Sequence, residues 1–174
     1  AQPSVTIANC SHPTTVNEGS DVTCVCKSQG GNPPANVTWY KDGVQIGNTS
    51  YGGNILTLTK VTKQDAGRYT CKAQSFTLTD EKSFDLIVHY KPINTKIKVP
   101  KEAYIGQKLE ITCEFDGLPK PNFTITHNGT TRIVSINANY AINRGVQYND
   151  AGIYTCIANN SLGNDTDSGS LIVK

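Results

Sequence analysis

Six cysteines and seven Asn-X-Ser/Thr triplets are the residues of this 174-residue chain whose types and spacing suggest chemistry. An even number of cysteines favours disulfide bonds, which persist in oxidising compartments. Each triplet is an acceptor for an N-linked glycan if the chain enters the secretory pathway. The triplets start at Asn9, Asn36, Asn48, Asn122, Asn128, Asn159 and Asn164. Both features predict an extracellular, disulfide-bonded glycoprotein.

Catalytic and metal-binding patterns are missing from the sequence. The three histidines, His12, His89 and His127, are scattered, and no two have the spacing of metal ligands. Residues 165–169 resemble the start of a calcium loop, but the glutamate that such a loop needs does not follow, so we expect a polar hairpin there. No nucleophile motif of the G-x-S-x-G kind occurs. We expect no enzyme activity, no metal and no cofactor.

Charge and hydropathy argue against two other classes of protein. The 16 Lys and Arg residues nearly balance the 14 Asp and Glu residues, whereas capture of nucleic acid needs a strongly basic surface. The longest apolar runs, such as residues 171–173, are too short to insert into a membrane. Because the sequence has no Met, we expect a mature or excised piece of a longer protein, with any signal peptide and membrane anchor outside it.

Two stretches of the sequence repeat the same landmarks. The matched positions, which lie 87, 86 and 85 residues apart, are Cys26 and Cys113, Trp39 and Ile125, and Cys71 and Cys156. A nearly constant offset indicates a duplicated domain of about 85–90 residues. This period is too long for a solenoid repeat and suits a small β-sandwich.

Alternation of apolar and polar residues predicts β-strands in both copies. Residues 22–26, 109–113 and 84–88 all alternate in this way. Turn-forming pairs, such as Asp-Gly at 42–43, separate the alternating stretches. The only helix-like piece that we expect is a short turn at residues 63–66.

The cysteine spacing and its surroundings resemble the immunoglobulin superfamily. The first copy has Cys26, Trp39 and the stretch Asp-Ala-Gly-Arg-Tyr-Thr-Cys at 65–71, and the second has Asp-Ala-Gly-Ile-Tyr-Thr-Cys at 150–156. The resemblance implies an all-β chain of two tandem Ig-like antiparallel β-sandwiches with Greek-key connections, arranged end to end.

In this family a disulfide joins strands B and F across the sandwich. The resemblance therefore implies the bridges Cys26–Cys71 and Cys113–Cys156, with Trp39 packed on the first. These bridges would close loops of 45 and 43 residues, for which the chain-entropy account gives about 4 kcal/mol each. Domains this small depend on such stabilisation, because they have little core for their surface.

The resemblance places Ig-like domain 1 at residues 1–90 and Ig-like domain 2 at residues 91–174. Only 30 residues separate Trp39 from Tyr69, too few for the extra C′C″ strands of a variable-type domain. We therefore expect the first domain to be of the I-set or C2 type and the second to be of the I-set type. Tyr69 and its counterpart Tyr154 match the tyrosine-corner position of the family.

The first copy has two additional cysteines, Cys10 and Cys24. Cys24 points to the same face of its strand as Cys26, and Cys10 falls on the expected first strand. We prefer the bridge Cys10–Cys24, which closes 14 residues and contributes about 3 kcal/mol. Cys26 is the better core cysteine because its spacing from the preceding glycine is the same in both copies. The alternative, Cys24–Cys71 with Cys10–Cys26, stays open.

The second copy has Ile125 in place of Trp39. Loss of a large buried aromatic side chain costs several kcal/mol in a core unless other residues fill the space. Phe123 and Tyr140 are the candidates to fill it. We expect the second domain to be the less stable one.

Four lysines, Lys91, Lys96, Lys98 and Lys101, form the one basic cluster of the sequence. They are a candidate site for heparan sulfate or another anionic partner, in a layout that resembles growth-factor receptors of the same superfamily. The alternative is that exposed lysines protect an edge strand from pairing with other chains.

Contacts with a partner are expected from exposed aromatic side chains. Alternation directs Tyr40 outward, and Tyr51 and Phe76 fall in expected loops. These three residues are candidates for a partner-binding face, with the alternative that each covers its own core. Glycans at Asn36 and Asn48 would narrow the usable area.

The predicted function is that of an extracellular recognition module of a cell-surface adhesion molecule or receptor, which binds a protein partner, self or other, by surface complementarity. This step rests on the resemblance, because a fold does not fix a function. One alternative is the ligand-binding ectodomain of a signalling receptor of the tyrosine kinase type, assisted by heparan sulfate. Another alternative is a soluble immune-recognition protein. A last one is an intracellular module of the muscle type, and the glycan acceptors and the extra bridge disfavour this module.

Overall fold

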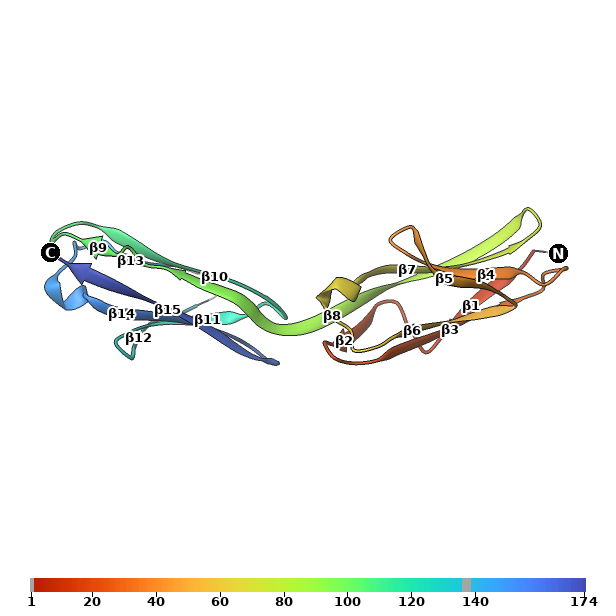
Figure 1. Ribbon diagram of the computed structural model, residues 1–174, viewed down its shortest axis with the longest axis horizontal. Helices are drawn as coiled ribbons and strands as arrows, with labels where there is room; N and C mark the ends of the chain where they lie inside the picture. The colour runs from red at the N-terminus through yellow and green to blue at the C-terminus, as the bar shows by residue number, and fades with distance from the viewer. Residues whose placement is uncertain (1, 136–138) are drawn as a thin grey trace. The chain divides into compact units, whose positions relative to one another are not determined.

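The computed structural model describes residues 2–135 and 139–174. The chain divides into two compact units, a first unit that ends at His89 and a second that begins at Tyr90. This division falls one residue before the boundary expected between residues 90 and 91. Figure 1 shows that each unit consists of two layers of β-strands.

The first unit has a small sheet and a larger one. The small sheet has the order β1 (Ser4–Ala8), β3 (Val22–Gln29) and β6 (Gly53–Leu58). The larger has the order β8 (Leu78–Lys98), β7 (Gly67–Ser75), β4 (Asn36–Lys41) and β5 (Val44–Tyr51), with β2 (Thr14–Asn17) parallel to β8. The strand β5 pairs with β4, as a C′ strand does, and the chain then passes directly to β6.

The second unit repeats this arrangement. One sheet has the order β13 (Asn139–Ile142), β10 (Leu109–Leu118) and the second part of β8. The other has the order β12 (Thr130–Ser135), β11 (Asn122–His127), β14 (Gly152–Asn160), β15 (Gly163–Val173) and β9 (Glu102–Ala103). The predicted fold class of two tandem β-sandwiches is confirmed, although β2–β8 and β9–β15 are short parallel pairs. The end-to-end arrangement stays a prediction.

One strand, β8, serves both units. Its first part pairs with β7 and with β2, whose last partner is His89, and its second part pairs with β10 from Tyr90 onward. The boundary expected between residues 90 and 91 implied a break between two strands there, but β8 runs through it. The strand continues because its first part has partner strands in the first unit and its second part pairs with β10, with irregularities in register between Tyr90 and Lys96.

The core of the first unit is built on Trp39. Its ring meets Phe84 edge-on, with ring centroids 6.1 Å apart, and Phe84 stacks on Tyr69 at 5.4 Å. All three side chains are buried, as is the bridge Cys26–Cys71, whose Cα atoms are 6.5 Å apart. Aromatic pairs of this kind add to the stabilisation that burial of apolar area provides.

The core of the second unit replaces the tryptophan with several smaller contacts. Ile125 is fully buried beside the bridge Cys113–Cys156. Both residues expected to compensate do pack in this core, since Phe123 is buried and Tyr140 is half-buried against Tyr154, with ring centroids 6.5 Å apart. The sequence interpretation missed His127, whose buried ring stacks on Tyr154 at 4.4 Å.

The structure pairs the two additional cysteines with each other, so the bridge is Cys10–Cys24, with a Cα–Cα distance of 5.5 Å. Together the three bridges use all six cysteines of the sequence. Cys10 was expected on the first strand, but it lies after the end of that strand. The strand β1 ends at Ala8, and Asn9 turns the chain with a φ of +73°.

Two short 3₁₀ turns precede the strands β7 and β14, whereas only one was expected. They are η1 (Lys63–Asp65) and η2 (Tyr148–Asp150). After each turn a tyrosine hydroxyl donates a hydrogen bond to the carbonyl at its last residue, Tyr69 to Asp65 and Tyr154 to Asp150. Burial raises the pKa of both tyrosines to about 12, so their hydroxyls stay protonated donors. These are the two tyrosine corners that the sequence indicated.

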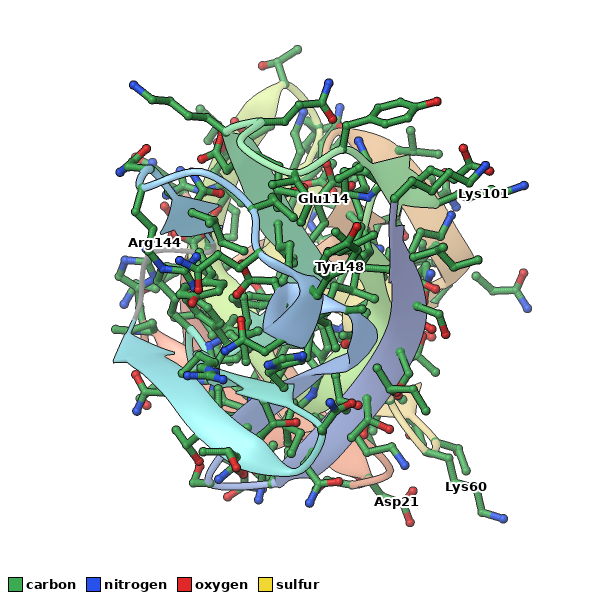
Figure 2. All side chains as sticks on the ribbon, turned by 90° about the vertical axis from the view of Figure 1, so that its left-hand side faces the viewer. Asp21, Lys60, Lys101, Glu114, Arg144 and Tyr148 are labelled. Atoms are coloured by element: carbon green, nitrogen blue, oxygen red, sulfur yellow. A yellow bond between two sulfur atoms is a disulfide. The ribbon has the colours of Figure 1, made fainter. Side chains whose placement is uncertain are left out.

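An ion pair holds the turn η2. Arg144 donates two hydrogen bonds to the carboxylate of Asp150, at 2.7 and 2.9 Å, and the Gln147 N–H donates a third at 2.8 Å. Figure 2 labels Arg144 and the neighbouring Tyr148 in this region of the second unit. The hydrogen bonds from Arg144 hold the pKa of Asp150 below its usual value, although burial of the carboxylate opposes this shift.

Candidate functional site

The outward face of the sheet β8–β7–β4–β5 carries the most varied exposed chemistry of the first unit. Alternation along β7 buries Tyr69, Cys71 and Ala73, so the residues between them point outward. Tyr40, Gly43, Thr70, Lys72 and Glu81 line a shallow depression of about 350 Å³ on this face. We call these five residues the first-unit face.

The first-unit face combines an aromatic ring with both signs of charge. Tyr40 is half-buried, and it pairs in register with Thr70. Lys72 and Glu81 are directly opposite each other on β7 and β8. Side chains placed this way offer an apolar surface, a hydroxyl, an ammonium group and a carboxylate to a partner. Sequence reasoning found Tyr40 but missed Lys72, which the alternation around Cys71 could have indicated. It also missed Glu81, which only the register of β7 and β8 brings beside Lys72.

The other two candidate contact residues lie toward one end of the same sheet. Tyr51 is 80% exposed and Phe76 is 76% exposed, so neither covers its own core. Phe76 is in the turn between β7 and β8, as expected for a loop residue. The loop expected at Tyr51 was wrong, because β5 continues to this residue by pairing it with Asn36 of β4.

The equivalent face of the second unit is different in character. Register with the bridge cysteines places Thr126 where the first unit has Tyr40, and Ile157 where it has Lys72. The two faces share one detail, a pair of hydroxyl groups 2.7 Å apart, between Thr70 and Ser83 in one unit and between Thr155 and Ser168 in the other. The aromatic and charged groups at the centre are therefore particular to the first unit.

A groove opens between the strands β5 and β6 of the first unit. It has a volume of about 480 Å³, and Trp39 and Tyr69 are among its lining residues. The indole N–H of Trp39 donates to the Asn54 carbonyl at 3.0 Å, so the polar end of this ring is satisfied. Asn48 also lines the groove, so that a glycan on this residue would stand over its opening.

The four lysines of the basic cluster are all exposed. Lys96 pairs in register with Glu114 of β10, and the Lys98 ammonium lies 3.4 Å from the same carboxylate. Figure 2 labels Glu114 and Lys101. One acid between two of the lysines lowers the positive potential that an anionic partner would meet.

The acidic stretch at the end of the chain forms part of a hairpin, as expected. The carboxylates of Asp165 and Asp167 on β15 accept hydrogen bonds from the backbone N–H groups of Thr95 and Ile97, at 3.1 and 2.9 Å. The hydrogen bond from Thr95 keeps the pKa of Asp165 below its usual value. In the described part of the chain, no three His, Cys, Asp or Glu residues gather as metal ligands would.

The seven acceptor asparagines are all exposed, but they differ in their surroundings. Asn9 precedes the bridged Cys10. The side-chain oxygen of Asn128 accepts the Ile153 N–H at 2.8 Å, and its amide nitrogen lies against the Ala151 carbonyl and the His127 ring. The amide of Asn128 therefore has a structural role.

Among residues 2–135 and 139–174, no helix has the length and apolar character needed to span a membrane.

Comparison with known proteins gives a matching family and several related sequences. The sequence model described as immunoglobulin domain matches residues 2–75 and 91–160. The chain is 31% identical over 192 residues to neural cell adhesion molecule 1 of Bos taurus, which covers 92% of this chain and 22% of that protein. It is 33% identical over 168 residues to limbic system-associated membrane protein of Rattus norvegicus, which covers 90% of this chain and 48% of that protein.

The solved structures that resemble this chain have the same fold. A titin fragment superposes with a TM-score of 0.66 at 25% identity, covering 98% of both chains. A structure of Dpr2 Ig1–Ig2 in complex with DIP-Theta superposes with a TM-score of 0.74 at 24% identity, covering 99% of this chain and 65% of that one. The chain spans less than half the length of the curated relatives described above. The family match over both units shows that the chain belongs to the immunoglobulin domain family.

Proposed function

We propose that this chain is an extracellular recognition module of a cell-surface adhesion molecule or receptor, and that it binds a protein partner through the first-unit face. The observation that carries the proposal is the asymmetry between the two sandwiches. Tyr40, Lys72 and Glu81 occupy positions on the first unit for which the second has residues such as Thr126 and Ile157. Aromatic side chains such as Tyr40 are among those that contribute most binding energy at interfaces, and charged groups around them contribute specificity.

The related proteins support a partner at the cell surface. Neural cell adhesion molecule 1 is an adhesion protein by name, limbic system-associated membrane protein is a membrane protein by name, and Dpr2 was solved in complex with DIP-Theta. Recognition of this kind needs no bond-making chemistry, so the module is not an enzyme. A weak single contact gains strength when many copies on a membrane bind together.

The covalent features support an extracellular site of action. Three disulfides are typical of an oxidising compartment, and this disfavours an intracellular muscle-type role in spite of the likeness to titin. We place N-linked glycans on the exposed residues Asn36, Asn48, Asn122, Asn159 and Asn164. We set Asn9 apart because it adjoins a bridged cysteine, and Asn128 because its amide holds a turn.

Heparan sulfate is the less supported partner. Because Glu114 lies beside Lys96 and Lys98, we expect the unmodified chain to leave a heparin column at low salt. Strong retention on heparin that is lost in a Lys96→Glu/Lys98→Glu variant would instead favour the alternative function, a signalling receptor assisted by heparan sulfate.

The proposed function is tested by presenting a multivalent form of the full chain to a panel of cell-surface ectodomains that includes the chain itself. We expect saturable binding to at least one of them. Self-association in analytical ultracentrifugation would identify homophilic adhesion, whereas a strict monomer that binds another ectodomain would identify a heterophilic receptor. If the chain bound none of the ectodomains saturably, its own included, this result would contradict the proposal.

A further inference from the structure

Three acceptor asparagines lie side by side across the outward face of the second unit. Asn122 of β11 pairs in register with Asn159 of β14, and Asn159 pairs with Asn164 of β15. Residues directly opposite each other in antiparallel strands have side chains on the same face, with Cβ atoms about 5 Å apart. All three asparagines are exposed, whereas the adjacent Phe123 and Ala158 are buried. We call these three residues the asparagine row.

The row is particular to the second unit. In the first unit the equivalent row consists of Asn36, Gln74 and Thr79, and only Asn36 begins a glycan acceptor triplet. Two residues of the next row in the second unit, Thr124 and Thr166, are the hydroxyl residues of the triplets at Asn122 and Asn164. Residues of the glycan acceptor triplets thus cover this part of the sheet from β11 to β15.

We propose that the asparagine row is a composite glycosylation site whose neighbouring glycans shield one another from the enzymes that process them. The proposal rests on the extracellular location in the proposed function. In the reaction, the asparagine Nδ2 loses a proton and forms a bond to the anomeric carbon of an oligosaccharide carried by a lipid diphosphate. The bond between that carbon and the phosphate oxygen breaks, and the lipid diphosphate leaves and takes up the proton.

The spacing of the strands is the physical reason for the shielding. Neighbouring strands lie about 4.8 Å apart, so the three attachment points fall within about 10 Å of one another. Branched glycans are much wider than this spacing, and their stems must stand together above the sheet. Trimming enzymes reach the branches of such a cluster less easily than those of a single glycan. A further consequence is that this face of the second unit is closed to protein partners.

The first unit provides the internal comparison. Asn48 lies on the edge strand β5, and Asn36 pairs with Tyr51 and Gln74, neither of which is an acceptor. Glycans on these two residues have no neighbour in register. They experience the same secretory passage as the row, since they belong to the same chain.

The test is to secrete the full chain from an animal cell line behind an added signal peptide and to map each glycan by glycopeptide mass spectrometry. We expect the glycans of the row to remain largely of the untrimmed high-mannose type, while the glycan at Asn48 is trimmed. In a Ser161→Ala variant, which removes the triplet at Asn159 and keeps its side chain, the high-mannose fraction at Asn122 and Asn164 falls toward the level at Asn48. The matched control, Ser50→Ala, removes the Asn48 glycan and leaves the row unchanged.

Three results would overturn the proposal. They are fewer than two occupied sites in the row, trimming in the row as complete as at Asn48, and no change at Asn122 and Asn164 in the Ser161→Ala variant. None of these results bears on partner binding by the first-unit face. Conversely, failure of the chain to bind any partner would leave the state of these glycans as it is, so the two proposals fail separately.

Discussion

At the scale of single residues, the repeated Asp-Ala-Gly-x-Tyr-x-Cys stretch has a specific steric cause. Asp42 sits in a turn with a φ of +47°, and its carboxylate accepts the Arg68 N–H at 2.9 Å. A Cβ on Gly67 would lie 2.7 Å from that carboxylate. Asn128 has the same conformation, with a φ of +49°, and a Cβ on Gly152 would lie 2.3 Å from its side-chain oxygen. The glycine in each copy leaves room for the side chain that holds the turn.

This equivalence predicts the effects of substitutions at Asn128. We expect Asn128→Asp to preserve the free energy of unfolding, because Asp42 performs the same function in the first unit. Asn128→Ala should cost about 1 kcal/mol, because the Ile153 N–H loses its hydrogen bond to the side-chain oxygen. Urea unfolding of the glycan-free chain, followed by circular dichroism, measures both, with the exposed Asn143→Ala as control. Equal stabilities of Asn128→Ala and Asn143→Ala would show that the turn does not need this acceptor.

The ion pair at η2 predicts a particular sensitivity to acid. Since the folded-state pKa of Asp150 is lowered, its ionised form stabilises the second unit above the unfolded-state pKa of about 3.9, and this stabilisation is lost as the pH falls below it. We expect the urea midpoint of the second unit to fall more steeply on acidification in the unmodified chain than in Arg144→Gln. Arg68→Gln, which removes an exposed ion pair with Asp85, is the control. Parallel pH profiles for Arg144→Gln and the unmodified chain would refute this account.

At the scale of elements, local patterns predicted most strands, and non-local pairing decided the rest. Alternation at residues 22–26 and 109–113 was enough for β3 and β10, since one face of each is buried. Continuation of β5 to Tyr51 and of β8 through both units depended on partner strands, which alternation does not reveal. The same limit applies to the first-unit face, where the position of Glu81 beside Lys72 follows only from the register of β7 and β8.

The two cores predict different stabilities. The first unit has Trp39 in its core and a second bridge, whereas Ile125 takes the tryptophan position in the second unit. Trp39 is the only tryptophan of the sequence, so its fluorescence reports on the first unit, while circular dichroism reports on both. We expect the second unit to unfold at lower urea concentration, before the fluorescence changes. A fluorescence transition that precedes the remaining loss of circular dichroism would reverse this order.

The additional bridge should account for part of that difference. Cys10–Cys24 closes 14 residues, for which the chain-entropy account gives about 3 kcal/mol. A Cys10→Ala/Cys24→Ala variant is therefore expected to shift the fluorescence transition to lower urea and to leave the transition of the second unit in place. The bridge would be no stabiliser if the fluorescence midpoint stayed where it is in the unmodified chain.

At the scale of the whole molecule, duplication gave two sandwiches of the same topology whose outward faces have diverged. The first-unit face has aromatic and charged groups around a shallow depression, and the corresponding sheet of the second unit has a row of glycan acceptors. The sequence predicted both domains and the acceptors one by one. It did not predict that three acceptors share a row, because this depends on the register of β11, β14 and β15.

The central claim, that recognition takes place on the first-unit face, is tested most directly by two matched variants. Tyr40→Ala alters this face, and Thr126→Ala alters the equivalent position of the second unit. For a partner identified in the ectodomain panel, we expect Tyr40→Ala to weaken binding about ten-fold or more, which is about 1.4 kcal/mol, with an unchanged Trp39 fluorescence transition. Thr126→Ala should bind as the unmodified chain does. Full binding by Tyr40→Ala, or an equal loss in Thr126→Ala, would contradict the account.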